Sequence, residues 1–98
     1  MQAQVKTVTT SDQHTLCVKT WGDEKKIPLV LVHGYPDNQE VWEPIIEQLV
    51  DDYYVVTYDV RGAGLSSIPK RIKDYRLPRL SLDLQEVVDQ VLPNRNFH

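Results

Sequence analysis

Length, composition and charge place the chain among small globular proteins. It has 98 residues, of which 41% are hydrophobic and 26% are charged, and its formal net charge is −3. A chain of this length forms at most one domain, whose core can bury about 60–65% of the unfolded surface. The negative charge balance argues against a general affinity for nucleic acid or for anionic membranes.

The cysteine content and the first residues predict a cytoplasmic protein. Cys17 is the single cysteine, so no disulfide can form within the chain, which is typical of a reducing compartment. Cys17 has no cationic partner in the sequence that would activate it, and a structural thiol is favoured. The N-terminal residues contain no apolar signal segment, and no apolar run approaches the length of a membrane span.

The N-terminal third predicts an antiparallel hairpin. Residues 4–10 are rich in β-branched side chains, and residues 14–21 alternate between apolar and polar types. The polar link at residues 11–13 has the composition of a turn. A charged loop is expected at residues 22–26.

Two further strands and a helix are predicted in the middle of the chain. Residues 28–32 (PLVLV) are apolar at every position, which predicts a strand covered on both faces, as in a parallel sheet under helices. Residues 53–59 form a second apolar strand. A helix is expected from about Val41, because Pro44 is tolerated only in a first turn. Its apolar stripe consists of Trp42, Ile45, Ile46, Leu49 and Val50.

A long loop and a second amphipathic helix complete the pattern. The loop runs from residue 60 to residue 78, and the helix stripe that ends before Pro93 consists of Leu80, Leu84, Val87, Val88 and Val91. Acidic residues interrupt the basic cluster around this loop, which favours a solvated loop over a phosphate-binding patch. The basic residues are Lys70, Arg71, Lys73, Arg76 and Arg79. The whole order predicts an α/β fold in which two parallel βα units follow an antiparallel hairpin.

The first candidate site is the loop His33-Gly34-Tyr35-Pro36, which follows the first parallel strand. Ligands of open α/β sheets collect beyond the carboxyl ends of the strands. Pro36 fixes the path of the loop and supplies no competing donor, so the N–H of Tyr35 could face an oxyanion on a bound substrate. The alternative is an ordinary strand-to-helix turn with a packed His33 and Tyr35.

The second candidate site is the loop that follows Asp59. Its segment GAGLSS places Ser67 where the dinucleotide-binding pattern G-x-G-x-x-G needs glycine or alanine, so a dinucleotide site is disfavoured. Ser66 lacks the glycine that a G-x-S-x-G nucleophile elbow requires two residues later. A structural turn that uses glycine to reach positive φ is therefore favoured, either alone or as part of a pocket wall.

The two loops together resemble the N-terminal part of the α/β-hydrolase superfamily, and more narrowly its epoxide-hydrolase-like branch. The matching patterns are H-G-x-P at residues 33–36, the aromatic Trp42, and D-x-R-G-x-G-x-S at residues 59–66. Residues 75–91 are similar to the family's segment before the nucleophile strand, so the resemblance covers essentially the whole chain. YDVRGAG and the later YRL also resemble the hydrolase half of proteins that fuse such a domain to a short-chain dehydrogenase module.

The resemblance implies a hydrolase that opens epoxides or cleaves esters of small molecules. Such enzymes use a nucleophile–histidine–acid triad and no metal or organic cofactor. The backbone N–H of Tyr35 would contribute to the oxyanion hole. The residues implied to shape the loop or to line the substrate site are His33, Gly34, Pro36, Trp42, Asp59 and Arg61.

The family's nucleophile and catalytic histidine have no counterpart in this sequence. The nucleophile follows the next strand, which should begin near residues 97–98, and His14 and His98 do not match the family's base. We therefore expect residues 1–98 to be an incomplete α/β-hydrolase domain that ends before the nucleophile elbow and is inactive alone. Whether the nucleophile is aspartate or serine stays open.

An open strand edge provides the main alternative function. In the resembled topology the next strand pairs with residues 29–32, and without it this apolar strand would form an open edge. Such a chain would be marginally stable or would self-associate, and it could be a non-catalytic remnant that binds a partner by strand addition. A nucleotide-binding module is the third alternative, which the glycine spacing disfavours.

Overall fold

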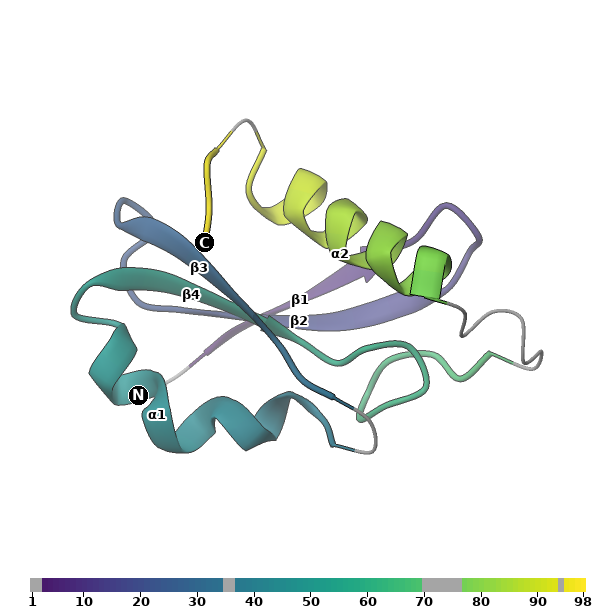
Figure 1. The fold of residues 1–98 in the computed structure, drawn as a ribbon, viewed down its shortest axis with the longest axis horizontal. Coiled ribbons are helices and arrows are strands. Elements are labelled where there is room, and N and C mark those ends of the chain that lie inside the picture. Colours follow the sequence, from purple (N-terminus) through teal and green to yellow (C-terminus); the bar gives the residue numbers. More distant parts are fainter. Residues whose placement is uncertain (1–2, 35–36, 70–76, 94) are drawn as a thin grey trace.

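The computed structural model describes residues 3–34, 37–69, 77–93 and 95–98, which form one sheet with helices on both faces (Figure 1). The strands are β1 (Gln4–Thr9), β2 (Thr15–Trp21), β3 (Ile27–Val32) and β4 (Tyr53–Tyr58). The helical segments are the 3₁₀ helix η1 (Gln39–Trp42), α1 (Glu43–Leu49) and α2 (Leu77–Val91).

The sheet has the order β1-β2-β4-β3, and its strand directions confirm the predicted α/β fold. β1 and β2 form the expected antiparallel hairpin, and β2 also pairs antiparallel with β4. β3 and β4 run parallel, with Val32 opposite Tyr58. The loops that follow these two strands therefore leave the sheet at the same end, the carboxyl end of the parallel strands.

β4 supplies both faces of the sheet with core residues. Its side chains alternate, as a strand period of two requires, so that Val56 packs with α2 and Val55 packs with α1. The core on the α2 face consists of Val8, Leu16, Val18, Tyr54, Val56, Tyr58, Val87, Val88 and Leu92. The smaller core on the α1 face consists of Trp21, Ile46, Val50 and Val55. Figure 1 shows α1 and α2 on opposite sides of the twisted sheet.

β3 corrects one expectation. Its continuous apolar run predicted burial on both faces, yet Leu29, Val30 and Leu31 are only half-buried and Val32 is 43% exposed. The reason is position, because β3 is one of the two outer strands of the sheet. On its open side the N–H of His98 donates to the Pro28 carbonyl (2.9 Å), and the N–H of Val30 donates to the His98 carbonyl (2.7 Å). These two bonds have the parallel ladder pattern, so residue 98 lies beside β3 in the parallel direction.

The helices follow the predicted stripes with two corrections. Ile45 is 39% exposed, because neighbouring positions on a helix lie about 100° apart and Ile46 takes the position that faces the sheet. α2 begins at Leu77, so Arg79 belongs to its first turn and forms ion pairs instead of lying in a solvated loop. The rest of the predicted basic cluster, residues 70–76, lies outside the described residues.

Candidate functional site

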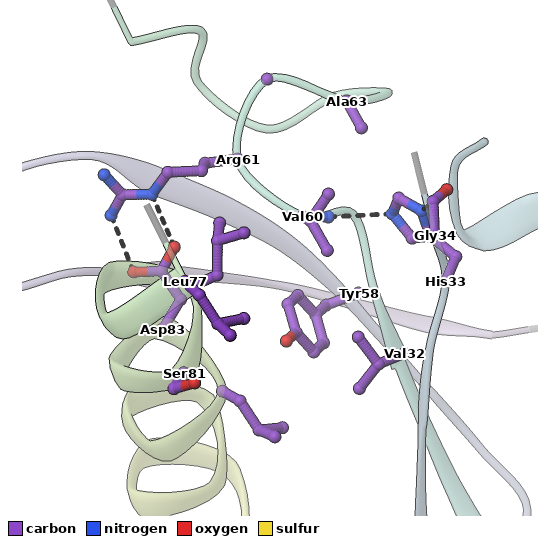
Figure 2. Close-up of a pocket in the computed structure, with 13 residues that line it drawn as sticks. Val32, His33, Gly34, Tyr58, Val60, Arg61, Ala63, Leu77, Ser81 and Asp83 are labelled. Atoms are coloured by element: carbon purple, nitrogen blue, oxygen red, sulfur yellow. Dashed lines mark hydrogen bonds and ion pairs between the residues drawn. The ribbon is translucent and has the colours of Figure 1, made fainter. Parts of the chain in front are cut away.

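The loops after β3 and β4 are joined by His33. The Nε2 atom of its buried imidazole accepts a hydrogen bond from the backbone N–H of Val60 at 3.0 Å (Figure 2). The Nδ1 atom lies 3.1 Å from the Gly34 carbonyl, which can only accept, so Nδ1 carries the proton. Because both ring nitrogens are engaged in this way, the imidazole fixes the loop path.

A second set of hydrogen bonds connects the loops after β3 and β4 to the sheet. We call the residues that form it the Asp59 cluster, which consists of Cys17, Gln39, Asp59 and Ser66. The buried Asp59 carboxylate accepts hydrogen bonds from the backbone N–H of Gln39 (2.8 Å) and of Leu65 (3.1 Å). The Asp59 N–H donates to the Cys17 carbonyl at 3.0 Å. One carboxylate therefore fixes the start of η1 and the loop after β4 against the end of the sheet.

The contacts of Ser66 and Cys17 favour a structural role for both side chains. The Ser66 hydroxyl donates to the Asp59 carbonyl at 2.6 Å and accepts from the Cys17 N–H at 2.9 Å. Burial and the nearby Asp59 charge raise the pKa of the Cys17 thiol, which favours the unreactive protonated form. These contacts agree with the sequence analysis, which disfavoured both side chains as nucleophiles.

Gly64 allows the Asp59 carboxylate to sit inside its loop. Gly64 has a positive φ of 49°, a conformation that favours glycine. A Cβ atom added at this position would overlap the carboxyl group of Asp59. The second glycine of the D-x-R-G-x-G-x-S pattern is therefore explained by both backbone conformation and space.

Arg61 lies in a separate group, the Arg61 network, which consists of Asp12, Arg61, Arg79, Asp83 and Glu86. The Arg61 guanidinium is buried and forms a bidentate pair with Asp83, with Nε–Oδ2 and Nη2–Oδ1 distances of 2.6 and 2.7 Å (Figure 2). It also contacts both carboxylate oxygens of Asp12, in the turn between β1 and β2. Arg79 joins Asp83 to Glu86. The network thus connects the hairpin turn, the loop after β4 and α2.

These pairs shift the pKa values of their members. The hydrogen bond from Arg61 holds the pKa of Asp12 well below its ordinary value. Burial alone would lower the pKa of Arg61, but the bonds to Asp12 and Asp83 outweigh it and raise that pKa. The pKa shifts of Asp12 and Arg61 therefore both favour the ionised pair.

A pocket of about 730 Å³ opens between the ends of β3 and β4 and the first turns of α2. Of the site residues predicted from sequence, His33, Gly34 and Arg61 line it. The other lining residues are Val32, Tyr58, Val60, Gly62, Ala63, Leu77, Leu80, Ser81, Asp83 and Leu84. Burial raises the pKa of Tyr58 to about 12, with a smaller contribution from the Asp83 charge, so its hydroxyl stays protonated at neutral pH. The walls are mostly apolar, and the polar side chains stand on both sides, with Arg61 and Asp83 on one side and His33 on the other (Figure 2).

Two predicted site residues lie away from this pocket. Asp59 is not among the lining residues and acts through the Asp59 cluster. Trp42 packs against the core on the α1 face, and its buried Nε1 has no hydrogen-bond partner within the part of the chain that the structure describes. Tyr35 and Pro36 lie outside the described residues, so the predicted role of the Tyr35 N–H stays a prediction.

Sequence reasoning missed Gln39 and the acidic members of the Arg61 network. Asp83 carried a signal, since a carboxylate between Leu80 and Leu84 on an apolar helix stripe needs a cationic partner. Gln39 carried none, because its burial depends on partners from β2 and from the end of β4, which are distant in the sequence.

Neither a metal site nor a membrane-spanning helix occurs in the described ranges. No three His, Cys, Asp or Glu side chains in residues 3–34, 37–69, 77–93 and 95–98 are grouped to hold a metal ion. No helix within these ranges has the length and apolar character needed to cross a bilayer. The cytoplasmic location stays a prediction.

In sequence, the chain is similar to short parts of longer known proteins. The chain is 36% identical over 70 residues to the probable oxidoreductase EphD of Mycobacterium bovis, covering 71% of this chain and 12% of that protein. It is 34% identical over 67 residues to epoxide hydrolase 3 of Xenopus tropicalis, covering 68% of this chain and 18% of that protein. The chain therefore spans less than a fifth of the length of these two relatives. The resemblance to hydrolase–dehydrogenase fusions stays a prediction.

Solved structures and a family model also show similarity to hydrolases. The crystal structure of epoxide hydrolase A from Mycobacterium thermoresistibile superposes with a TM-score of 0.83 at 33% identity, covering 92% of this chain and 28% of that one. The family model described as the alpha/beta hydrolase fold matches residues 27–98. This match contains both loops, the pocket and α2, and the chain belongs to the α/β-hydrolase family, with epoxide-hydrolase-like relatives.

Proposed function

We propose that this chain supplies the oxyanion-hole loop of a hydrolase that acts on epoxides or esters. The observation that carries the proposal is the anchoring of the β3–η1 loop, residues 33–38, beside the pocket. His33, the first residue of the loop, accepts a hydrogen bond from the Val60 N–H. Gln39, which directly follows the last residue of the loop, donates its N–H to Asp59. A loop anchored at both ends can present a backbone N–H without reorganising when negative charge develops.

The chemistry expected of the loop is stabilisation of an oxyanion. In ester hydrolysis, attack on the carbonyl carbon places negative charge on its oxygen, and the N–H of Tyr35 would donate to that oxygen. In epoxide opening by an aspartate nucleophile, the same charge develops when water hydrolyses the enzyme ester. Removing one such donor typically costs about 10²–10³ in kcat. The mostly apolar pocket walls fit an apolar substrate.

The nucleophile and the general base are proposed to come from residues other than these 98. Both ring nitrogens of His33 are engaged in hydrogen bonds, to the Gly34 carbonyl and to the Val60 N–H, and the Ser66 hydroxyl donates to the Asp59 carbonyl. Neither side chain is available for attack or proton transfer. We expect the 98-residue chain alone to show no turnover of styrene oxide or p-nitrophenyl acetate.

The proposal is tested in a chimaera in which residues 1–98 replace the matching part of epoxide hydrolase A. Tyr35→Pro removes the backbone N–H, whereas the matched control Tyr35→Phe keeps it. We expect kcat to fall by about 10²–10³ for Y35P and to stay near the parent value for Y35F. Equal kcat values for two folded variants would contradict the proposal.

The open side of β3 supports a second candidate, binding of a partner by strand addition. Residue 98 pairs beside Leu29, whereas Val32 further along the strand is 43% exposed. An apolar edge of this kind favours pairing with another strand. Light scattering after size exclusion tests self-association by this edge, and a constant monomer mass over a wide concentration range would count against it.

A further inference from the structure

Gln39 is a buried amide at the point where the β3–η1 loop enters η1. The residue is only 3% exposed. Burying an amide without partners is unfavourable, so its contacts identify what it holds in place. Its position matters because Tyr35, the proposed oxyanion donor, lies in the loop that it ends.

Gln39 is attached to the sheet at three points. Its backbone N–H donates to Asp59 Oδ1 at 2.8 Å. Its side-chain Nε2 donates to the Cys17 carbonyl at 3.2 Å, and its Oε1 accepts from the Thr57 hydroxyl at 2.6 Å. The partners come from β2, from β4 and from the residue directly after β4.

The directions of these bonds allow one orientation of the amide. The Trp21 indole N–H lies 3.3 Å from Thr57 Oγ1 and can only donate, so the Thr57 proton is directed to Gln39 Oε1. On the other side the Cys17 carbonyl can only accept, so it faces Nε2. A rotated amide would bring two acceptors together at Cys17. The Gln39 side chain is therefore locked in both place and direction.

We infer that Gln39 is a positioning residue that holds the end of the β3–η1 loop, residues 37–38, against the sheet, an inference that rests on the proposed function of the loop. His33 holds the first residue of this loop, and Gln39 directly follows its last residue. Within it, the Asp37 N–H donates to the Gly34 carbonyl at 2.9 Å. Loosening Gln39 should therefore release the end of the loop and weaken the hydrogen bond between Asp37 and Gly34.

Amide hydrogen exchange in the 98-residue chain, measured by NMR, tests the inference without relying on activity. Gln39→Met keeps the length of the side chain, removes its hydrogen bonds to Cys17 and Thr57, and leaves the backbone bond to Asp59 in place. We expect the Asp37 and Gln39 amides to exchange about tenfold faster or more, relative to core amides, and the Tyr35 amide resonance to shift. Val8→Ala, a buried substitution on β1, is the control for general destabilisation and should leave these ratios unchanged.

A second pair of variants isolates one anchor. Thr57→Val removes the hydroxyl that donates to Oε1, whereas Thr57→Ser retains it. We expect faster loop exchange in T57V and the parent rate in T57S. Loop amides that keep their parent rates relative to the core in both Q39M and T57V would overturn the inference, even if both variants melt at lower temperature.

The two proposals can fail separately. If Q39M loosens the loop but Y35P keeps full activity in the chimaera, the oxyanion function fails and the anchoring by Gln39 stands. If Y35P loses activity but Q39M leaves loop exchange unchanged, the oxyanion function stands and the role of Gln39 fails. If both hold, Q39M in the chimaera lowers kcat with little change in KM, because the oxyanion forms only after substrate binding.

Discussion

The Asp59 cluster and the Arg61 network both hold the loop after β4, but they do so in different ways. In the Asp59 cluster, a carboxylate, a hydroxyl and an amide bond mostly to backbone N–H and carbonyl groups. In the Arg61 network, charged side chains bond chiefly to one another. Bonds to the backbone fix the path of a loop, whereas ion pairs join elements whose backbones are already formed. Breaking the first group should alter the loop, and breaking the second should alter stability.

The largest expected effect comes from Arg61→Met. Its side chain is fully buried, and its loss leaves the buried Asp83 carboxylate without its bidentate partner. Removing one member of a buried ion pair typically costs about 3–5 kcal/mol of unfolding free energy. Urea denaturation measures this cost. The matched variant Arg79→Met, whose side chain is partly exposed, should cost about 1 kcal/mol. Equal costs would contradict the distinction between the two arginines.

Asp59→Asn should cost less stability than R61M but disturb the loops more. Its new NH₂ group would face one of the two backbone N–H donors, Gln39 or Leu65, and leave it unsatisfied. We expect a cost of about 2–3 kcal/mol and faster hydrogen exchange at both amides. The exposed Asp37→Asn is the control of the same chemistry. Unchanged exchange at Gln39 and Leu65 in D59N would show that the carboxylate does not hold them.

Gly64→Ala separates backbone conformation from charge. The added Cβ would overlap the Asp59 carboxyl group, and the left-handed backbone alone costs about 1–2 kcal/mol. Thermal unfolding should therefore show a lower midpoint for G64A. Gly34→Ala is the matched control, because no atom lies within 4 Å of the Cβ it would add. A destabilisation of G34A as large as that of G64A would contradict this explanation.

The smallest expected effect is the pH dependence that Asp12 gives the Arg61 network. Because the hydrogen bond from Arg61 depresses the pKa of Asp12 in the folded state, the ionised carboxylate stabilises the fold above its ordinary pKa of 3.8. This contribution is lost as the pH falls below that value. Asp12 is partly exposed, so solvent screening limits the effect to about 1 kcal/mol or less. Unfolding free energies measured between pH 6 and pH 3 should fall less steeply for Asp12→Asn than for the parent chain.

The sequence predicted the elements whose patterns are local. The hairpin, β4 and the apolar stripe of α2 follow from alternation and helical spacing, and they determine the α/β architecture. The burial of β3 could not be read from its own residues, because it depends on which strand lies beside it. The start of α2 was placed late because Leu77-Pro78 looked like the end of a loop, although proline is compatible with a first helical turn.

The site was predictable where a motif names the residue and unpredictable where distant segments meet. The motif identified His33, Asp59 and Arg61, and the structure shows their partners in Val60, Gln39 and Asp83. Gln39 has no motif. Its role depends on Cys17 and Thr57, which approach it only once β2 and β4 have paired and η1 has packed against them.

Exchange of the Tyr35 amide with solvent tests the central claim most directly. If the anchored loop leaves this N–H facing the site, its exchange rate in the 98-residue chain should approach the intrinsic rate. The Val60 and Gln39 amides, which donate to His33 and Asp59, should be protected under the same conditions. A Tyr35 amide as strongly protected as that of Val60 would mean that it is bonded within the protein, and would contradict its assignment to an oxyanion hole.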